Sequence, residues 1–307
     1  MTGEPLRPPT ASASRGDVGR GDPSPVPRLE AHAVAARSRL MEQVARGPDM
    51  DLLEAALWIA AEEYPGLDVE REMRRVDTLG GEAARRVVAR ANPFARVDAV
   101  REFLFEELRF QGNSESYDDP RNSYLNEVLD RRLGIPLTLS LLYLEVAARA
   151  GLIVRGVALP GHFVVRVDEQ GRTVFVDPFH AGAIITEEDC RDLVFRTTGR
   201  VALFRRDILE GASGSQMLSR LLLNLKRIHL AQGSYDKALG CVERLLVVQP
   251  DDAREIRDRG LLLAHMGRPT AAIADLEHYL ARVPQAPDAD SVRGRLAWLM
   301  RKLTDVS

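Results

Sequence analysis

Apolar side chains recur at helical spacing through the first third of the chain. In the stretch MDLLEAALWIAAEEYPGL, one helical face carries Leu53, Leu57 and Ala61. Asp51 is expected to cap this helix and Pro65 to end it. The same spacing predicts three further helices, over residues 69–79, 81–91 and 96–108. The N-terminal part of the fold is therefore expected to be mainly helical.

A loop of 14 residues is expected next, over residues 110–123, where the sequence is FQGNSESYDDPRNS. Connections of this length are longer than most structural connections, and those that occur are often functional. Disorder is the alternative interpretation of the same stretch.

The following segment changes from an apolar helix to strands. Residues 137–150 are LTLSLLYLEVAARA, which is almost entirely apolar and predicts a helix over residues 136–150 inside the domain, ended by Gly151. The sequences LIVRGVALP and HFVVRVDEQGRTVFVDPF then have strand composition, with a hairpin turn near residues 170–171. Helices that lead into a small antiparallel sheet predict an α+β domain.

The hairpin predicts that one histidine and one aspartate share a face of the sheet. A two-residue turn at residues 170–171 puts Val164 opposite Asp177. Because side chains alternate between faces, Asp177 lies on the same face as Val164 and as His162, one diagonal step away. We therefore expect His162 and Asp177 to form a hydrogen bond, whereas a slip of one residue in register would separate them.

The last third of the chain contains an internal repeat with a period of 34 residues. Four pairs of residues have this spacing: Gly233 and Gly267, Ala238 and Ala272, Leu246 and Leu280, Pro250 and Pro284. The glycine, the small residue and the closing proline resemble the tetratricopeptide pattern, and residues 290–303 predict a capping helix. Because such arrays usually need about three units to be stable, this array is expected to lean on the domain before it.

Composition and charge narrow the classes of function. The chain has 307 residues, of which 45% are hydrophobic, so it can bury a core and its length favours two domains. Its 42 basic and 45 acidic residues alternate along the sequence, so a nucleic-acid partner is not expected. Neither a secretory signal nor a membrane span is expected, because long apolar runs are missing. With only Cys190 and Cys241, a disulfide framework is not expected, and the cytoplasm is the expected compartment.

These patterns divide the chain into three parts. Residues 1–27 mix Pro, Gly, Ser and charge, and are expected to form a disordered tail. Residues 28–212 are expected to form the α+β domain. Residues 213–307 are expected to form an all-α, tetratricopeptide-like region that includes the capping helix.

The α+β part resembles a known superfamily. The similar segments are NSYLNEVLDRRLGIPLTLSLLYLEVAARAGL, PGHFVVR and VDPF, with ALWIAAEEYPGLDVE upstream. They resemble the transglutaminase-like superfamily of papain-type folds, and in particular its bacterial SirB-like branch, which is often fused to tetratricopeptide repeats. In catalytic members, a cysteine sits at the start of the core helix, a histidine on the following strand and an aspartate on the next.

This resemblance assigns the histidine to His162 and the aspartate to Asp177, but Pro136 stands near the place of the cysteine. A helix N-terminus lowers the pKa of a thiol, whereas proline is well tolerated at the first helical position. Pro136 therefore preserves the helix start and removes the nucleophile. Thr138 and Ser140 are the alternative nucleophiles, although hydroxyl groups bonded to the backbone of a buried helix are the expected arrangement.

The two cysteines are not expected to replace the missing thiol. Cys190 lies among carboxylates in TEEDCRD, which disfavour a thiolate. Cys241 occupies a position in a repeat helix that suits a small buried side chain.

Residues just before the core helix are candidates for lining the cleft. Asn122 is expected to cap a helix that begins at Ser123, and Tyr124 and Asn126 are expected to face the cleft that holds His162. The SirB-like pattern has asparagine and aromatic positions here, which implies a retained binding pocket. A capped amphipathic helix without a pocket role is the alternative.

A zinc site is a further possibility, because His180 follows Asp177 by three residues and His162 is near. However, DPFH bends at Pro178, so His180 is not expected to point toward the other two residues. No metal or other cofactor is therefore expected.

Together these patterns favour a binding protein over an enzyme. The expectation is a non-catalytic transglutaminase-like scaffold or regulatory protein that binds a peptide or protein partner through its cleft and its repeat surface. The alternative is an amide or ester hydrolase, or an acyl transferase, in which Thr138 or Ser140 attacks with His162 as base and Asp177 as its orienting group.

Overall fold

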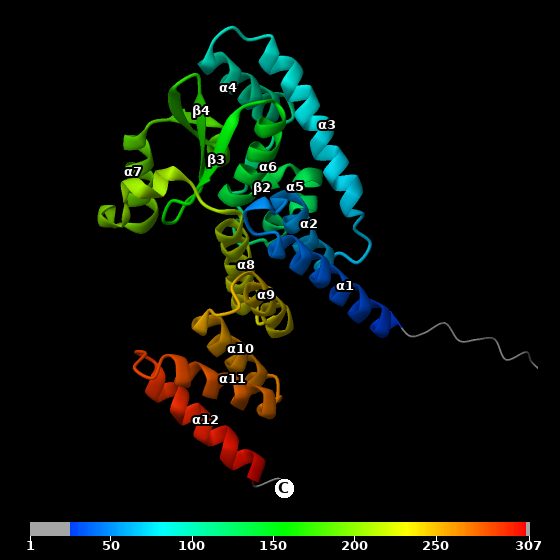
Figure 1. Ribbon diagram of the computed structural model, residues 1–307, viewed down its shortest axis with the longest axis vertical. Coiled ribbons are helices and arrows are strands. Elements are labelled where there is room, and N and C mark those ends of the chain that lie inside the picture. The colour runs from blue at the N-terminus through cyan, green and yellow to red at the C-terminus, as the bar shows by residue number, and fades with distance from the viewer. Residues whose placement is uncertain (1–24, 305–307) are drawn as a thin grey trace, which may run out of the picture.

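The computed structural model describes residues 25–304 of the chain, so the expected N-terminal tail falls almost wholly outside the described residues. The helices are α1 (Pro25–Ala45), α2 (Leu52–Glu63), α3 (Val69–Val88), α4 (Pro93–Arg101), α5 (Leu125–Arg131), α6 (Pro136–Arg149), α7 (Glu187–Thr198), α8 (Gly214–Ala231), α9 (Tyr235–Val248), α10 (Ala253–His265), α11 (Pro269–Arg282) and α12 (Ala289–Thr304). The strands are β1 (Gln111–Gly112), β2 (Leu133–Gly134), β3 (Ile153–Val157), β4 (Val164–Glu169), β5 (Arg172–Asp177) and β6 (Ala183–Ile185). An α+β part followed by an all-helical part is confirmed (Figure 1).

The larger sheet is antiparallel, with strand order β3-β4-β5-β6. Its central hairpin turns at residues 170–171, both of which have the positive φ angles that a tight two-residue turn requires. Val165 pairs with Val176, which is the register counted from the sequence. The predicted hairpin register is thus confirmed, and it decides where Asp177 lies.

Helix α6 lies in the interior of the α+β part (Figure 1), as its apolar sequence predicts. It packs against β3 and β4 of the sheet and against α3. Eleven of its 14 residues are buried. Gly151, with a φ of 84°, follows the helix and provides the left-handed conformation that commonly ends one.

Two predicted helices differ in the structure. The helices expected over residues 69–79 and 81–91 are one continuous helix, α3, which passes through Gly80 and Gly81. Gly80 is buried where α3 meets Arg149 of α6, and a Cβ atom at that position would lie only 2.4 Å from the Cβ of Arg149. The glycine therefore permits close helix packing and does not break the helix. The helix expected over residues 96–108 begins at Pro93 and continues after Arg101 as a π-helical segment, Glu102–Glu107.

Residues 110–123 are more ordered than the predicted loop. Strand β1 pairs in parallel with β2, and a 3₁₀ helix, η3 (Pro120–Ser123), ends the segment. The buried side chain of Asn113 donates a hydrogen bond to Asn122 (3.1 Å). In turn, the Asn122 amide donates to the carbonyl of Ser116 at 2.7 Å. Strands of two residues are too short to produce a periodic sequence pattern, so the parallel pair was not predicted.

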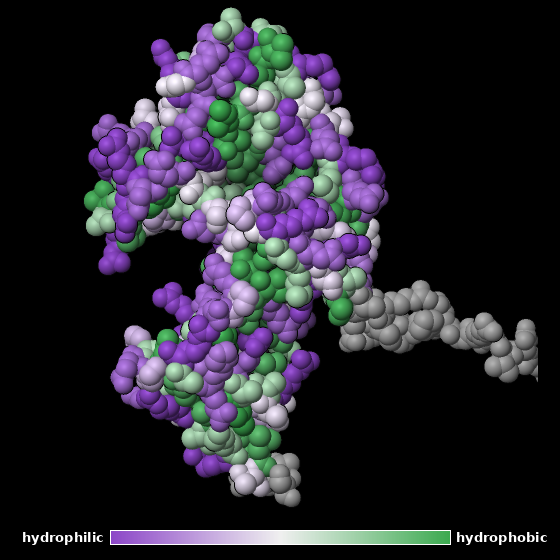
Figure 2. All heavy atoms as spheres, in the orientation of Figure 1, coloured by the Kyte–Doolittle hydropathy of each residue, from purple (hydrophilic) through white to green (hydrophobic). Residues whose placement is uncertain are grey.

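The repeat region packs against the α+β part, as expected for a short array. Helices α8 and α9 pack against α2 and α1, and Leu222 of α8 belongs to the same hydrophobic core as α6. Arg244 of α9 donates to the carbonyl of Ile59 at 3.2 Å, and Arg37 of α1 forms an ion pair with Glu243. The outer helices α10, α11 and α12 share a separate core with α9. Figure 2 shows a hollow on one face between the α+β part above and the repeats below.

Gly80 and Gly81 should respond oppositely to substitution by alanine. Gly81→Ala adds a methyl group in open space and should raise the free energy of unfolding by about 0.5–1 kcal/mol, because alanine favours the helix. Gly80→Ala forces α3 away from Arg149 and should lower it by about 1–3 kcal/mol. Urea denaturation of the two variants measures both values. Equal effects would contradict the close packing of α3 on α6.

Candidate functional site

His162 and Asp177 form a buried pair at one end of the sheet. His162 lies just before β4, and Asp177 is the last residue of β5. Nε2 of His162 lies 2.9 Å from Oδ2 of Asp177, and both side chains are almost fully buried. The predicted hydrogen bond is therefore present, because the hairpin register places both residues on one face.

Asp177 also organises the turn that follows it. Its Oδ1 accepts hydrogen bonds from the backbone N–H groups of Phe179 (3.1 Å) and His180 (3.4 Å). Burial by itself raises the pKa of Asp177, but the hydrogen bonds and charges of His162 and His180 outweigh it and hold that pKa below its usual value. The carboxylate is thus the centre of a network rather than half of an isolated pair.

His180 points toward this pair, contrary to the expectation from the bend at Pro178. Its Nδ1 lies 2.7 Å from Oδ2 of Asp177, because the 3₁₀ turn η4 (Pro178–His180) brings the ring back over the carboxylate. One ligand atom from each of His162, Asp177 and His180 lies within 4.8 Å of the others. This spacing is within reach of a zinc ion. However, both imidazoles already contact the same carboxylate oxygen, so hydrogen bonds alone satisfy the cluster.

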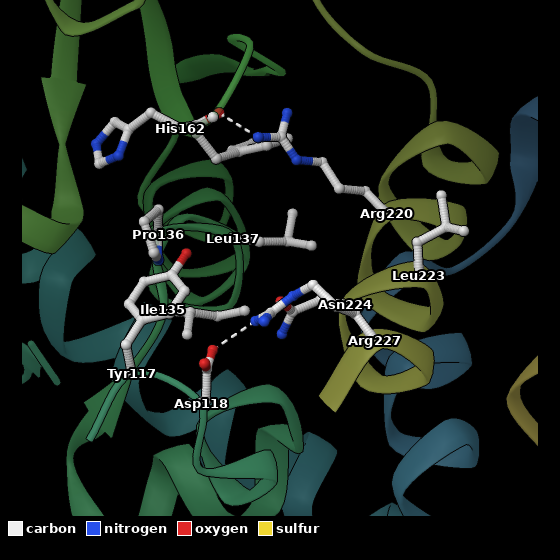
Figure 3. Close-up of a pocket in the computed structure, with 12 residues that line it drawn as sticks. Tyr117, Asp118, Ile135, Pro136, Leu137, His162, Arg220, Leu223, Asn224 and Arg227 are labelled. Atoms are coloured by element: carbon white, nitrogen blue, oxygen red, sulfur yellow. Dashed lines mark hydrogen bonds and ion pairs between the residues drawn. The ribbon is translucent and has the colours of Figure 1, made fainter. Parts of the chain in front are cut away.

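Pro136 occupies the first position of α6 and lines the same cavity as His162 (Figure 3). Ile135, the residue before it, has an extended conformation and provides no capping side chain. Proline fits the first helical position because its missing N–H would have no helical partner there. A helix N-terminus favours a thiolate, but α6 contains no cysteine.

The hydroxyl groups of Thr138 and Ser140 bond to the backbone. Thr138 Oγ1 donates to the carbonyl of Asn122 (2.7 Å) and accepts from the N–H of Ile135 (3.2 Å). Ser140 Oγ donates to the carbonyl of Phe163 at 3.4 Å. Both side chains are fully buried, and neither bonds to the imidazole of His162.

Cys190 and Cys241 are free and buried. Burial and nearby carboxylates raise the pKa of Cys190 to about 12. Burial also raises the pKa of Cys241, with Arg244 offsetting part of that effect. Neither thiol therefore has the accessible, electropositive surroundings of a reactive cysteine.

Three residues expected near the cleft lie elsewhere. Asn122 belongs to η3 and holds the preceding segment together, while α5 begins at Leu125 without a side-chain cap. The ring of Tyr124 packs edge-on against Tyr64, and its hydroxyl lies 3.4 Å from His229. Asn126 is buried, with no hydrogen-bond partner for Oδ1. A helix pattern shows which residues are buried, but not against which neighbour.

The cavity has a volume of about 490 Å³ and lies between the start of α6 and the first repeat helix, α8 (Figure 3). The lining residues are Tyr117, Asp118, Ile135, Pro136, Leu137, Gly161, His162, Phe163, Arg220, Leu223, Asn224 and Arg227. The contribution of α8 to the cavity is not evident from the sequence pattern. The available signal was an arginine and an asparagine, Arg220 and Asn224, one helical turn apart in an amphipathic helix.

Figure 3 shows how Arg220 reaches the His162 segment. The imidazole of His162 is turned away from Arg220, whereas its backbone carbonyl accepts a hydrogen bond from Nη2 of Arg220 at 2.7 Å. Arg220 thereby links the repeat helix to the segment just before β4 that contains His162. Further along α8, Arg227 forms an ion pair at 2.5 Å with Asp118, which lies on the facing side of the cavity.

The fold and this site define a transglutaminase-like domain joined to tetratricopeptide repeats. Residues 70–223 match the family model described as transglutaminase-like superfamily, and residues 225–297 match a tetratricopeptide repeat model. The chain belongs to the UPF0162 family, whose members are SirB-like. Among the described residues, no helix is long and apolar enough to cross a membrane.

Similar proteins come from bacteria and from animals. A UPF0162 protein of Xylella fastidiosa strain Temecula1 is 35% identical over 254 residues, 80% of this chain and 89% of that protein. One from Pseudomonas aeruginosa is 33% identical, covering 75% of this chain and 83% of that protein. The F-box only protein 21 of Mus musculus is 29% identical over 56% of this chain, but only 28% of that protein. A solved structure of menin covers 87% of this chain and 70% of its own, with a TM-score of 0.40 and 10% identity.

The lowered pKa of Asp177 predicts a pH-dependent stability. A carboxyl group with a lower pKa in the folded state stabilises the fold above its unfolded pKa, which is about 4, and this contribution is lost as the pH falls through the folded value. Asp177→Asn should therefore lower the free energy of unfolding at pH 7 by about 1–3 kcal/mol. The difference from wild type should shrink below about pH 4.

Urea denaturation at several pH values measures this difference. Asp192→Asn, at an exposed position on α7, is the control and should have little effect at any pH. If Asp177→Asn costs the same stability at pH 7 and at pH 3, the charge of Asp177 is not what stabilises the turn.

Proposed function

We propose that this protein is a non-catalytic scaffold or regulatory protein, in which the transglutaminase-like part and the repeats together bind a peptide or protein partner. The observation that supports this most strongly is the chemistry at the start of α6. Pro136 begins α6, near the place that the resemblance assigns to the nucleophile, and the nearby hydroxyl groups of Thr138 and Ser140 donate to backbone carbonyls. Without a thiol or hydroxyl group for His162 to deprotonate, the site does not contain a nucleophile.

The position of the cavity supports binding. Its walls come from both parts of the chain, so a ligand there would contact the transglutaminase-like part and the first repeat helix together. Tetratricopeptide repeats generally mediate protein–protein interaction, and this array continues from the cavity through α9 to α12. We place this activity in the cytoplasm, which fits two buried cysteines that are not paired with each other.

The enzymatic alternative requires a different local structure. For Thr138 to attack a substrate, its hydroxyl would have to leave the carbonyl of Asn122 and reach His162. Ser140 would likewise have to leave the carbonyl of Phe163, although it is fully buried. The buried carbonyl groups left behind would be unsatisfied, which costs about 1–3 kcal/mol each.

Activity-based probes test the absence of catalysis directly. The full-length protein should remain unlabelled by a fluorophosphonate, which reacts with activated serines, and by iodoacetamide under native conditions, because both thiols are buried. Mass spectrometry measures the labelling. Fluorophosphonate labelling that disappears in His162→Ala would overturn the proposal in favour of a hydrolase.

Pro136→Cys should restore a reactive thiol if the surrounding geometry is that of a site without its nucleophile. A thiol there would lie at the N-terminus of α6 on the same cavity wall as His162, and both features favour the thiolate. Alkylation by iodoacetamide at pH 7 should be about tenfold faster than in the double variant Pro136→Cys, His162→Ala. Equal rates would show that His162 does not face the start of α6.

A further inference from the structure

Arg220 is a partly buried cation without a carboxylate partner. No acidic side chain lies within ion-pair distance of its guanidinium among the described residues, and its only hydrogen bond is to the backbone carbonyl of His162. Its guanidinium also lies 5.6 Å from the ring centroid of Phe163. Burial lowers the pKa of Arg220, and only Tyr117 acts in the opposite direction. Several N–H donors of this group therefore remain unused.

Other buried cations of the same region are neutralised by acids. Lys226, six residues further along α8, contacts Glu255 at 2.7 Å and Asp258 at 2.5 Å. Arg244 of α9 lies 3.6 Å from Glu62. Because a buried charge is costly unless it is paired, an unpaired guanidinium that faces a cavity indicates a place for an external anion.

The surroundings of Arg220 add polar donors to one side of the cavity. The hydroxyl of Tyr117 points toward Pro136 in Figure 3 and bonds to no described residue. Burial raises the pKa of Tyr117, and the nearby guanidinium groups of Arg220 and Arg227 offset part of that rise. Arg227 carries a second positive charge, which Asp118 compensates.

The remaining walls are apolar. Ile135 and Leu137 come from the start of α6, and Leu223 of α8 is 45% exposed despite its apolar side chain. A volume of about 490 Å³ is within the range of sites that enclose a small ligand or a short peptide segment. One unpaired cation among apolar walls suits a single carboxylate next to an apolar side chain better than a polyanion.

We propose that the cavity between α6 and α8 recognises a single carboxylate group on an otherwise uncharged, partly apolar peptide segment, with Arg220 as the group that binds the carboxylate. This inference rests on the proposed binding function and specifies its ligand. The carboxylate is either the C-terminus of the partner or the side chain of an aspartate or glutamate. Arg220 keeps its bond to the His162 carbonyl and uses its remaining N–H groups for the ligand.

Three pools of acetylated hexapeptides, randomised over uncharged residues, distinguish these sources. The first pool has a free C-terminus, the second is amidated, and the third is amidated with one glutamate. Equilibrium dialysis against the full-length protein, followed by mass spectrometry, measures retention. Preferential retention of the first pool supports a C-terminal carboxylate, and that of the third supports a side-chain carboxylate. Equal retention of the neutral second pool, or no retention of any pool, overturns the inference.

Two variants with opposite expected effects on peptide retention test whether the peptides bind in this cavity. Arg220→Gln should weaken retention of the preferred pool by about tenfold or more, because it removes a charge-assisted hydrogen bond. Asp118→Asn should strengthen retention by about threefold, because it removes a negative charge from the cavity wall and frees Arg227. Arg71→Gln, at an exposed position on α3, is the matched control and should leave retention unchanged.

Circular dichroism and thermal unfolding check that each variant is folded. If Arg220→Gln does not fold, the Asp118→Asn result decides the outcome: unchanged or weaker retention overturns the inference. Cleavage of a retained peptide would overturn the non-catalytic proposal instead, while the preference among the pools would still test carboxylate recognition.

Discussion

The burial of helix α6 is the constraint on which the rest of the structure depends. Its apolar side chains fill the space between the sheet, α3 and the first repeat helix, so a rotation of the helix would break close packing on several sides. Its N-terminus is consequently held beside the loop that carries His162. The position of Pro136 in the cavity is therefore a result of core packing, and so is the approach of α8 to the opposite wall.

The His162–Asp177 pair has a structural role that does not depend on a nucleophile. Asp177 accepts hydrogen bonds from two backbone N–H groups and from two imidazoles, so its carboxylate joins the end of β5 to the turn that follows. Because a buried carboxylate without such partners would be costly, the network and the hairpin stabilise each other. Such a network stabilises the turn without any contribution from a thiol.

The two parts of the chain are physically interdependent. Helix α8 contributes apolar side chains to the core around α6, and Arg220 on the same helix donates a hydrogen bond to the backbone carbonyl of His162. The repeats therefore cannot move far from the transglutaminase-like part without opening the cavity. A short repeat array usually needs a further packing surface to be stable, and the transglutaminase-like part provides that surface here. The same packing places Arg220 in the wall of the cavity.

Local patterns in the sequence determined much of this structure. The turn at residues 170–171 and the alternation of the strands decide the register, and hence that His162 meets Asp177. The 34-residue period predicted the repeats, and Pro136 predicted the start of α6. These features depend on residues close together in sequence or on a regular spacing, so they can be predicted from one sequence.

The tertiary structure alone decided the features that depend on distant neighbours. Gly80 lies inside a continuous helix, where it allows close packing on Arg149, and Tyr124 turns toward His229 rather than the cleft. His180 joins Asp177 because a 3₁₀ turn reverses the chain after β5. Above all, Arg220 becomes part of the cavity because α8 packs beside α6, and no local periodicity reports which helix will supply the facing side chain.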